Sequence, residues 1–171
     1  MSSLERLREI IRAEGEPLAS ALRPVADAAP VVGALAASGP RAARDRDGYE
    51  LLVEAIYEGY LLHYEHSRLL ASSDPNLALL AGDRLYALGL ERLVELGDLE
   101  AVGELADVIS LCALLHARGE PALCREVWLA GARAVGYGAS AAHAHAKQLL
   151  LERSPGARAA LASVVEPPAL A

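Results

Sequence analysis

Three consecutive helical segments in residues 54–115 restrict the possible folds of this chain more than any other feature of its sequence. Apolar residues recur there at the spacing of an α-helix. The segments are separated before Pro75, where Asp74 can cap a helix that begins with proline, and at Gly97, which suits a helix end. We therefore expect a helical bundle, with residues 76–96 as its buried central helix because they are apolar nearly all round.

Small residues lie along one face of the expected central helix. Ala78, Gly82 and Gly89 share this face when residues are placed at about 100° intervals around a helix. A glycine inside a helix costs roughly 1 kcal/mol relative to alanine, so two glycines on one face indicate that another backbone packs closely there. These three residues are our candidates for a helix interface.

The composition favours helices over sheets. The chain of 171 residues contains no phenylalanine and few aromatic residues, and 53% of it is hydrophobic, which is enough for one buried core. We expect a single all-α domain over residues 1–164, a bundle of about 7–8 helices, and a frayed tail over residues 165–171, which contain two consecutive prolines. The further helices are expected at residues 3–13, 17–28, 31–37, 48–70, 98–117, 121–135 and 140–153, with a short one after Pro155.

The charge and the cysteines disfavour several classes of protein. A net charge of −7 and a pI near 5.2 argue against a nucleic-acid-binding surface, which needs clustered positive charge. No apolar run reaches the ~20 residues of a membrane span, and the first residues show no signal-peptide pattern. We therefore expect a soluble cytoplasmic protein without a transmembrane segment. Cys112 and Cys124 lack the spacing of metal ligands and are interpreted as reduced core residues.

Two histidines project toward the apolar side of the helix expected at residues 48–70. His63 and His66 are three residues apart, a spacing that can place two imidazoles on one metal ion, with Asp83 or Glu58 as a further ligand. A second ligand pair such as Glu-x-x-His is absent, so hydrogen-bonded, partly buried histidines are the simpler interpretation. Asp83 is expected to form hydrogen bonds at the edge of the core. We expect no metal ion and no other cofactor.

The run Glu-Ala-Ile-Tyr-Glu-Gly-Tyr-Leu-Leu-His-Tyr-Glu-His-Ser-Arg at residues 54–68 resembles a helix of the trans-prenyl diphosphate synthases. That family shows a glutamate, an apolar and small stretch, and then a histidine followed by Asp-Asp-x-x-Asp. Glu54 and His63 keep this spacing, and Tyr64, Glu65 and Arg68 stand where the three aspartates would be. The next helix contains Leu-Ala-Gly-Asp, as the family's following helix does, so the resemblance covers roughly residues 48–115.

The resemblance implies a prenyl-synthase-like fold but no catalysis by this chain alone. In the family, the aspartates hold Mg²⁺ ions that neutralise the diphosphate leaving group. Tyr64 supplies no ligand at neutral pH, Arg68 puts a positive charge where a metal would lie, and the chain contains no Asp-Asp pair. The resemblance therefore implies a non-catalytic regulatory or scaffold subunit, similar to component I of heptaprenyl diphosphate synthase, which pairs with a catalytic subunit to make the menaquinone side chain.

Two other interpretations of the sequence remain open, a ligand- or metal-binding helical bundle and a homodimeric structural protein without an enzymatic role. The first would be built around His63, His66 and Asp83. A homodimer, or a heterodimer with a catalytic synthase subunit, is expected to use much of residues 74–117 as its surface. The candidate pocket or degenerate-motif residues are His63, Tyr64, Glu65, His66, Arg68 and Asp83, and the candidate interface residues are Ala78, Gly82 and Gly89.

Overall fold

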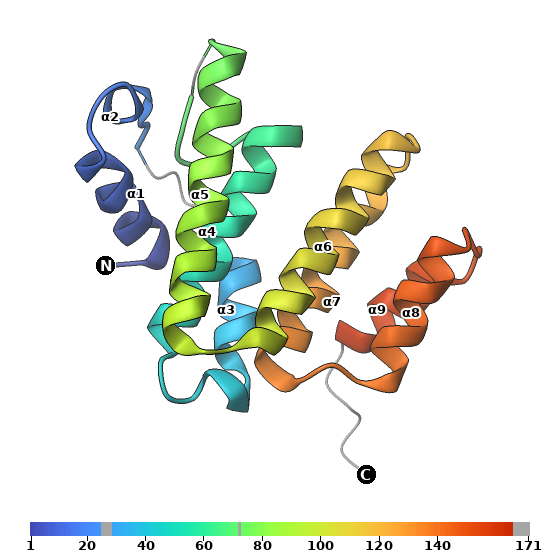
Figure 1. The fold of residues 1–171 in the computed structure, drawn as a ribbon. Coiled ribbons are helices and arrows are strands. Elements are labelled where there is room, and N and C mark those ends of the chain that lie inside the picture. The colour runs from blue at the N-terminus through green and yellow to red at the C-terminus, as the bar shows by residue number, and fades with distance from the viewer. Residues whose placement is uncertain (25–28, 72, 166–171) are drawn as a thin grey trace.

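The chain forms α-helices throughout the part that its computed structural model describes, which is residues 1–24, 29–71 and 73–165 (Figure 1). Within these ranges there is no strand, and a single antiparallel bridge joins Leu22 to Leu70. The prediction of an all-helical bundle is confirmed. The described helices are α1 (Ser3–Ala13), α2 (Leu18–Ala21), α3 (Val31–Ser38), α4 (Arg46–Tyr64), α5 (Pro75–Leu96), α6 (Leu99–Ala117), α7 (Cys124–Tyr137), α8 (Ala141–Leu151) and α9 (Ala157–Val165), with short 3-10 turns at Pro40–Ala42 and Pro121–Leu123.

The central helix is α4, and the prediction that residues 76–96 occupy this place is wrong. Twelve residues of α4 are buried, whereas α5 buries five of its 22 residues. Helix α4 packs against α1, α3 and α5, and α7 packs against α3, α6 and α9. Figure 1 shows α5 in front of α4, with α6, α7, α8 and α9 forming the other half of the bundle. The apolar character of α5 on all sides therefore does not reflect burial, because its outer face is open to solvent.

The glycines of α5 lie against α4, as the small-residue face predicted. A Cβ atom on Gly82 would lie 2.7 Å from His63 Nε2 and 3.1 Å from the Gly59 carbonyl oxygen. A Cβ atom on Gly89 would lie 2.3 Å from the Ile56 side chain. The two helices approach closely because neither glycine carries a side chain. The contact that these glycines make is with a helix of the same chain.

The two ends of α5 lie at Asp74 and Gly97, the residues at which the sequence predicted them. Asp74 accepts a hydrogen bond from the Asn76 amide at 2.9 Å, and Gly97 ends the helix with φ of +69°. Asp98 caps the next helix by accepting from the Ala101 amide at 3.0 Å. These local hydrogen bonds satisfy amide and carbonyl groups that a helix leaves unpaired at its ends.

Two predicted helices are too long, because the chain leaves the helical conformation to form tertiary hydrogen bonds. The helix predicted at residues 48–70 ends at Tyr64. The helix predicted at residues 17–28 is reduced to α2, after which the Arg23 amide donates to the Leu69 carbonyl at 2.9 Å. Residues 25–28 lie outside the described ranges. The predicted frayed tail also lies there, except that Val165 belongs to α9.

No helix in the described ranges is long and apolar enough to cross a membrane. Cys112 and Cys124 are both buried and are not joined by a disulfide. Their prediction as core residues is therefore confirmed.

Candidate functional site

The predicted site residues lie in three separate places around the C-terminal end of α4. The first place is the contact between α4 and α5, where His63 Nε2 lies 3.2 Å from Asp83 Oδ1 without the geometry of a hydrogen bond. The His63 ring stacks on Tyr86, with ring centroids 5.1 Å apart. The Asp83 side chain is 71% exposed, so the prediction that it forms hydrogen bonds at the edge of the core is wrong.

The second place faces α6 and contains Tyr64 and Glu65. The Tyr60 hydroxyl donates to Glu65 Oε1 at 2.8 Å and lies 3.0 Å from His116 Nε2. Tyr64 stacks on the His116 ring, with centroids 4.2 Å apart. Burial and the hydrogen bonds of Tyr60 raise the pKa of its hydroxyl well above its ordinary value, so Tyr60 stays neutral and Glu65 serves as its acceptor.

The third place contains Arg68, which closes a buried charge cluster with Glu54 and Glu58. Both glutamates are fully buried within α4, one turn apart. Arg68 Nε donates to Glu58 Oε1 at 2.5 Å, and its terminal nitrogen donates to Glu54. The Gly33 amide of α3 donates to Glu54 Oε1 at 2.6 Å, and the Ser67 hydroxyl donates to Glu58 Oε2 at 2.5 Å. Each carboxylate therefore has partners from outside its own helix.

This cluster explains where α4 ends. Beyond Tyr64 the chain turns back, which brings Ser67 and Arg68 over the carboxylates of α4. Ser67 Oγ also accepts from the amides of Leu69 and Leu70 at 3.1 and 3.0 Å. Two buried carboxylates without a counter-ion would cost far more free energy than the helical turn that is given up.

The electrostatics of the cluster follow from its burial. Desolvation raises the pKa of Glu54 even though Arg68 lies beside it. Desolvation acts to lower the pKa of Arg68, but the charges of Glu54 and Glu58 outweigh it and hold the pKa above its ordinary value. The guanidinium therefore stays charged, and the cluster depends on it.

A cavity of about 300 Å³ adjoins this cluster between α3, α4 and α7. Its wall includes the two arginines Arg68 and Arg125, together with His66. Tyr57 and Trp128 supply an aromatic side, with ring centroids 5.0 Å apart, and the Arg68 guanidinium lies 5.1 Å from the centre of the Tyr57 ring. The buried Trp128 Nε1 has no hydrogen-bond partner in the part of the chain that the structure describes. A small molecule with an apolar body and an anionic group fits this combination of wall residues.

The structure separates the residues of the predicted metal site. His63 contacts α5, whereas His66 follows the end of α4 and lines the cavity on the α3 and α7 side. The two histidines are therefore not on one helical face, because the helix ends between them. Glu58 is bound by Arg68 and Ser67. Among the described residues no group of three or more His, Cys, Asp or Glu side chains is placed to hold a metal ion.

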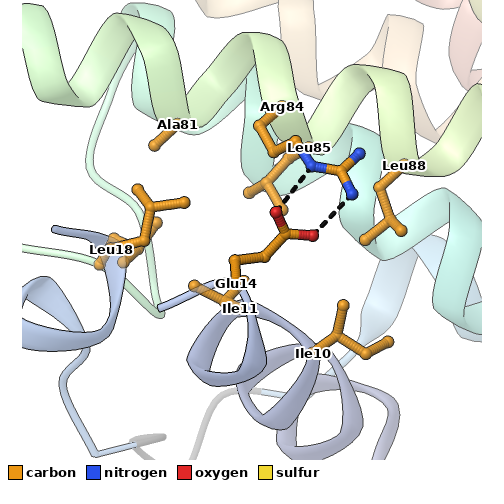
Figure 2. Close-up of a pocket in the computed structure, with 9 residues that line it drawn as sticks. Ile10, Ile11, Glu14, Leu18, Ala81, Arg84, Leu85 and Leu88 are labelled. Atoms are coloured by element: carbon orange, nitrogen blue, oxygen red, sulfur yellow. Dashed lines mark hydrogen bonds and ion pairs between the residues drawn. The ribbon is translucent and has the colours of Figure 1, made fainter. Parts of the chain in front are cut away.

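A smaller apolar hollow lies between α1 and α5 and is shown in Figure 2. Arg84 spans its edge and donates to both carboxylate oxygens of Glu14, at 3.1 and 2.6 Å. The space inside is about 10 Å³, which is room for about one water molecule. This hollow is a packing seam between helices and too small for an organic ligand.

Several residues of these sites could not be assigned a role from the sequence. Glutamates at positions 50, 54 and 58 follow one another at helical spacing, a pattern typical of a charged outer face, yet Glu54 and Glu58 are both buried. The spacing of four residues between them was the available signal. Nothing in the sequence indicates that Arg68 pairs with them, because that pairing depends on the turn after Tyr64.

No protein-family model, curated protein or solved structure matches this chain.

Proposed function

We propose that this chain is a non-catalytic subunit that binds a helical partner through the outer face of α5. The observation that carries the proposal is a stripe of exposed apolar side chains on this face. Leu79 and Leu80 lie near the start of α5 and are 48% and 67% exposed, and Leu90 and Val94 lie near its end and are 38% and 71% exposed. All four fall on one side of the helix at about 100° per residue. We call these four residues the α5 stripe. The opposite side of α5 is filled by α4.

The α5 stripe consists of two exposed apolar pairs on one side of the same helix, Leu79 with Leu80 and Leu90 with Val94. The exposed Asp83 lies between the two pairs. Isolated surface leucines are common, whereas contiguous apolar patches are typical of interaction sites. Amphipathic helices bind their partners through apolar side chains at this spacing. Leu99, at the start of α6, is 78% exposed and extends the apolar surface beyond the end of α5.

The partner that we propose is a catalytic prenyl diphosphate synthase subunit, with a role in making the quinone side chain. This choice of partner depends on the resemblance of residues 48–115 to that family. A helical partner would cover the α5 stripe, while the chain itself contributes no metal-binding aspartate cluster. A second copy of this chain is the competing occupant.

The proposal is tested by co-purification of the chain with a catalytic subunit encoded beside it. We expect the two to elute together and the complex to be lost in Leu80→Glu/Val94→Glu. The matched control is Leu151→Glu, since Leu151 is an exposed leucine on α8. Retention of the complex in the double variant, or its equal loss in the control, would contradict the role of the α5 stripe.

A second candidate function is the binding of a small amphipathic carboxylate in the cavity between α3, α4 and α7. It is favoured by Arg125, which lines the cavity beside the aromatic rings of Tyr57 and Trp128. Trp128 is the single tryptophan of the chain, so its fluorescence reports on the cavity directly. Titration with octanoate is expected to change this emission in a saturable way and to do so more weakly in Arg125→Gln. An emission that does not respond would exclude this ligand class.

A further inference from the structure

A second cavity, of about 450 Å³, lies where α7, α8 and α9 meet. These three helices form the C-terminal side of the bundle (Figure 1). The polar groups in its wall are the Arg133 guanidinium, the His143 imidazole and the hydroxyls of Tyr137, Ser140 and Ser163. None of them belongs to α5 or to the cluster around Arg68, so this cavity is independent of both surfaces described above.

The N-terminus of α8 opens into this cavity. Ser140 caps the helix by accepting a hydrogen bond from the His143 amide at 3.1 Å. The amides of Ala141 and Ala142 occupy the first two helical positions, where no acceptor exists within the helix. Gly138, with φ of +91°, allows the sharp turn that leads from α7 into this helix end. Unpaired amides and the helix dipole together favour an anion at this position.

The charge of the wall favours the same type of ligand. Arg133 lies over the ring of Tyr137, with 4.2 Å between the guanidinium carbon and the ring centre. Within the described part of the chain, Arg133 has no carboxylate partner, and no carboxylate lines this cavity. An arginine that is fixed by an aromatic ring and not neutralised is suited to bind an oxyanion.

His143 supplies independent evidence for a ligand. Its side chain is 6% exposed, and its Nε2 atom lies 2.8 Å from Glu104 Oε2. Glu104 also pairs with Lys147 at 3.2 Å, and Lys147 pairs with Asp107 at 2.6 Å. The other ring nitrogen, Nδ1, is buried and has no hydrogen-bond partner among the described residues. An unpaired buried nitrogen is costly, and His143 is one of the residues that line the adjoining cavity.

Three charged side chains surround His143 on the side away from the helix start, namely Glu104, Asp107 and Lys147. They hold the imidazole in place through its Nε2 atom.

We propose that this cavity binds a tetrahedral oxyanion, the phosphate group of a small phosphomonoester or free inorganic phosphate. The donors are the amides of Ala141 and Ala142 and the Arg133 guanidinium, and the His143 imidazole lies beside them in the wall. The hydroxyl of Ser163 lies in the same wall. The apolar part of the wall, formed by Ala130, Ala134 and Val164, leaves room for an organic group attached to the phosphate.

The experiment is a titration of the ¹⁵N-labelled full chain with inorganic phosphate and, separately, with glycerol phosphate, both at constant ionic strength in chloride. We expect saturable amide shifts centred on Ala141 and Ala142. Arg133→Gln should weaken binding at least about tenfold, the loss expected for one charge-assisted hydrogen bond. Arg44→Gln is the matched control, because it removes the same charge from an exposed arginine that lines neither cavity, and it should leave the affinity unchanged.

The two ligands distinguish the source of the phosphate group. Tighter binding of glycerol phosphate identifies a phosphomonoester site, and tighter binding of inorganic phosphate identifies a site for the free ion. Absence of saturable shifts with both, up to about 10 mM, would overturn the proposal. Equal weakening in Arg133→Gln and Arg44→Gln would also overturn it, because general charge attraction would then explain the binding. The spectrum of each variant shows whether that variant is folded. If Arg133→Gln does not fold, the presence or absence of saturable shifts in the parent chain tests the proposal.

Discussion

Replacement of Arg68 by methionine tests the buried charge cluster most sharply. Methionine keeps part of the apolar stem but leaves the carboxylates of Glu54 and Glu58 without a counter-ion inside the protein. Glu54 keeps its hydrogen bond from the Gly33 amide at 2.6 Å, and Glu58 keeps that from Ser67 at 2.5 Å. These neutral donors reduce the penalty without removing it.

The size of the effect has an upper limit set by proton uptake. A glutamate with an ordinary pKa of about 4.3 can be held protonated at pH 7 for about 3.7 kcal/mol, so no single carboxylate costs more than this. Loss of one partner from a buried ion pair typically costs about 3–5 kcal/mol. We therefore expect Arg68→Met to lower the free energy of unfolding by about 3–5 kcal/mol at pH 7.

The pH dependence identifies the cause of the loss. Burial already raises the pKa of Glu54, and removal of Arg68 should raise it further. The penalty falls on the ionised form, so it is complete above the raised pKa of the folded state. It disappears as the pH falls below about 4.3, the ordinary pKa that the carboxyl has in the unfolded chain.

Urea denaturation of the parent and of Arg68→Met, at matched pH values between 7 and 4, measures this difference. Arg125→Met should change stability by less than about 0.5 kcal/mol, because Arg125 is an exposed residue in the wall of the same cavity. Adding Glu54→Gln and Glu58→Gln to Arg68→Met should recover much of the loss. A deficit that is absent at pH 7, or that stays constant down to pH 4, would refute the reasoning.

Three further predictions concern a glycine contact, a hydrogen bond and the absence of catalysis. Gly89→Ala should destabilise the chain by about 1–3 kcal/mol, because the new Cβ atom would lie 2.3 Å from Ile56. The control is Gly103→Ala, where a Cβ meets nothing within 4 Å, and it should stabilise the chain by up to about 1 kcal/mol. Thermal melts measure both variants, and equal melting temperatures of the two would contradict the close contact at Gly89. Tyr49→Phe removes a 2.6 Å hydrogen bond to Asp98 and should cost about 1.5–3 kcal/mol in urea denaturation; an unchanged stability would show that this bond contributes nothing. The chain alone should form no product from isopentenyl and allylic diphosphates, with or without Mg²⁺, in a radiolabel assay freed of host synthase, and product formation would overturn its assignment as non-catalytic.

The local features of the fold were predictable because they depend on short stretches of sequence. Asp74 and Gly97 mark the ends of α5 through hydrogen bonds and dihedral angles that involve their nearest neighbours. The glycine face of α5 predicted a close backbone contact, and α4 provides it. Periodicity over whole helices therefore gave the fold class correctly.

The choice of central helix was not predictable, because burial depends on what covers a helix. Helix α5 is apolar on most sides, yet Leu80 and Val94 are exposed. Helix α4 buries two glutamates, Glu54 and Glu58, and is nevertheless the most enclosed element. The pairing of these glutamates with Arg68 requires the chain to turn after Tyr64, where neither glycine nor proline marks a helix end. Tertiary ion pairing overrides helix propensity at this point.

The pairing of Glu104 with His143 was also not predictable from the sequence. The two residues are 39 positions apart and lie on different helices. The sequence shows only that His143 and His145, two residues apart on a helix, point away from one another. The contact between α6 and α8 supplies the missing partner.

Light scattering of the chain in solution tests the central claim, that the outer face of α5 binds a helical partner. At micromolar concentration the chain is expected to be dimeric alone or to form a stable complex when mixed with a catalytic synthase subunit. The Leu80→Glu/Val94→Glu variant is expected to remain monomeric under both conditions and to keep the parent's helical circular dichroism. A parent chain that stays monomeric both alone and in the mixture would contradict the claim.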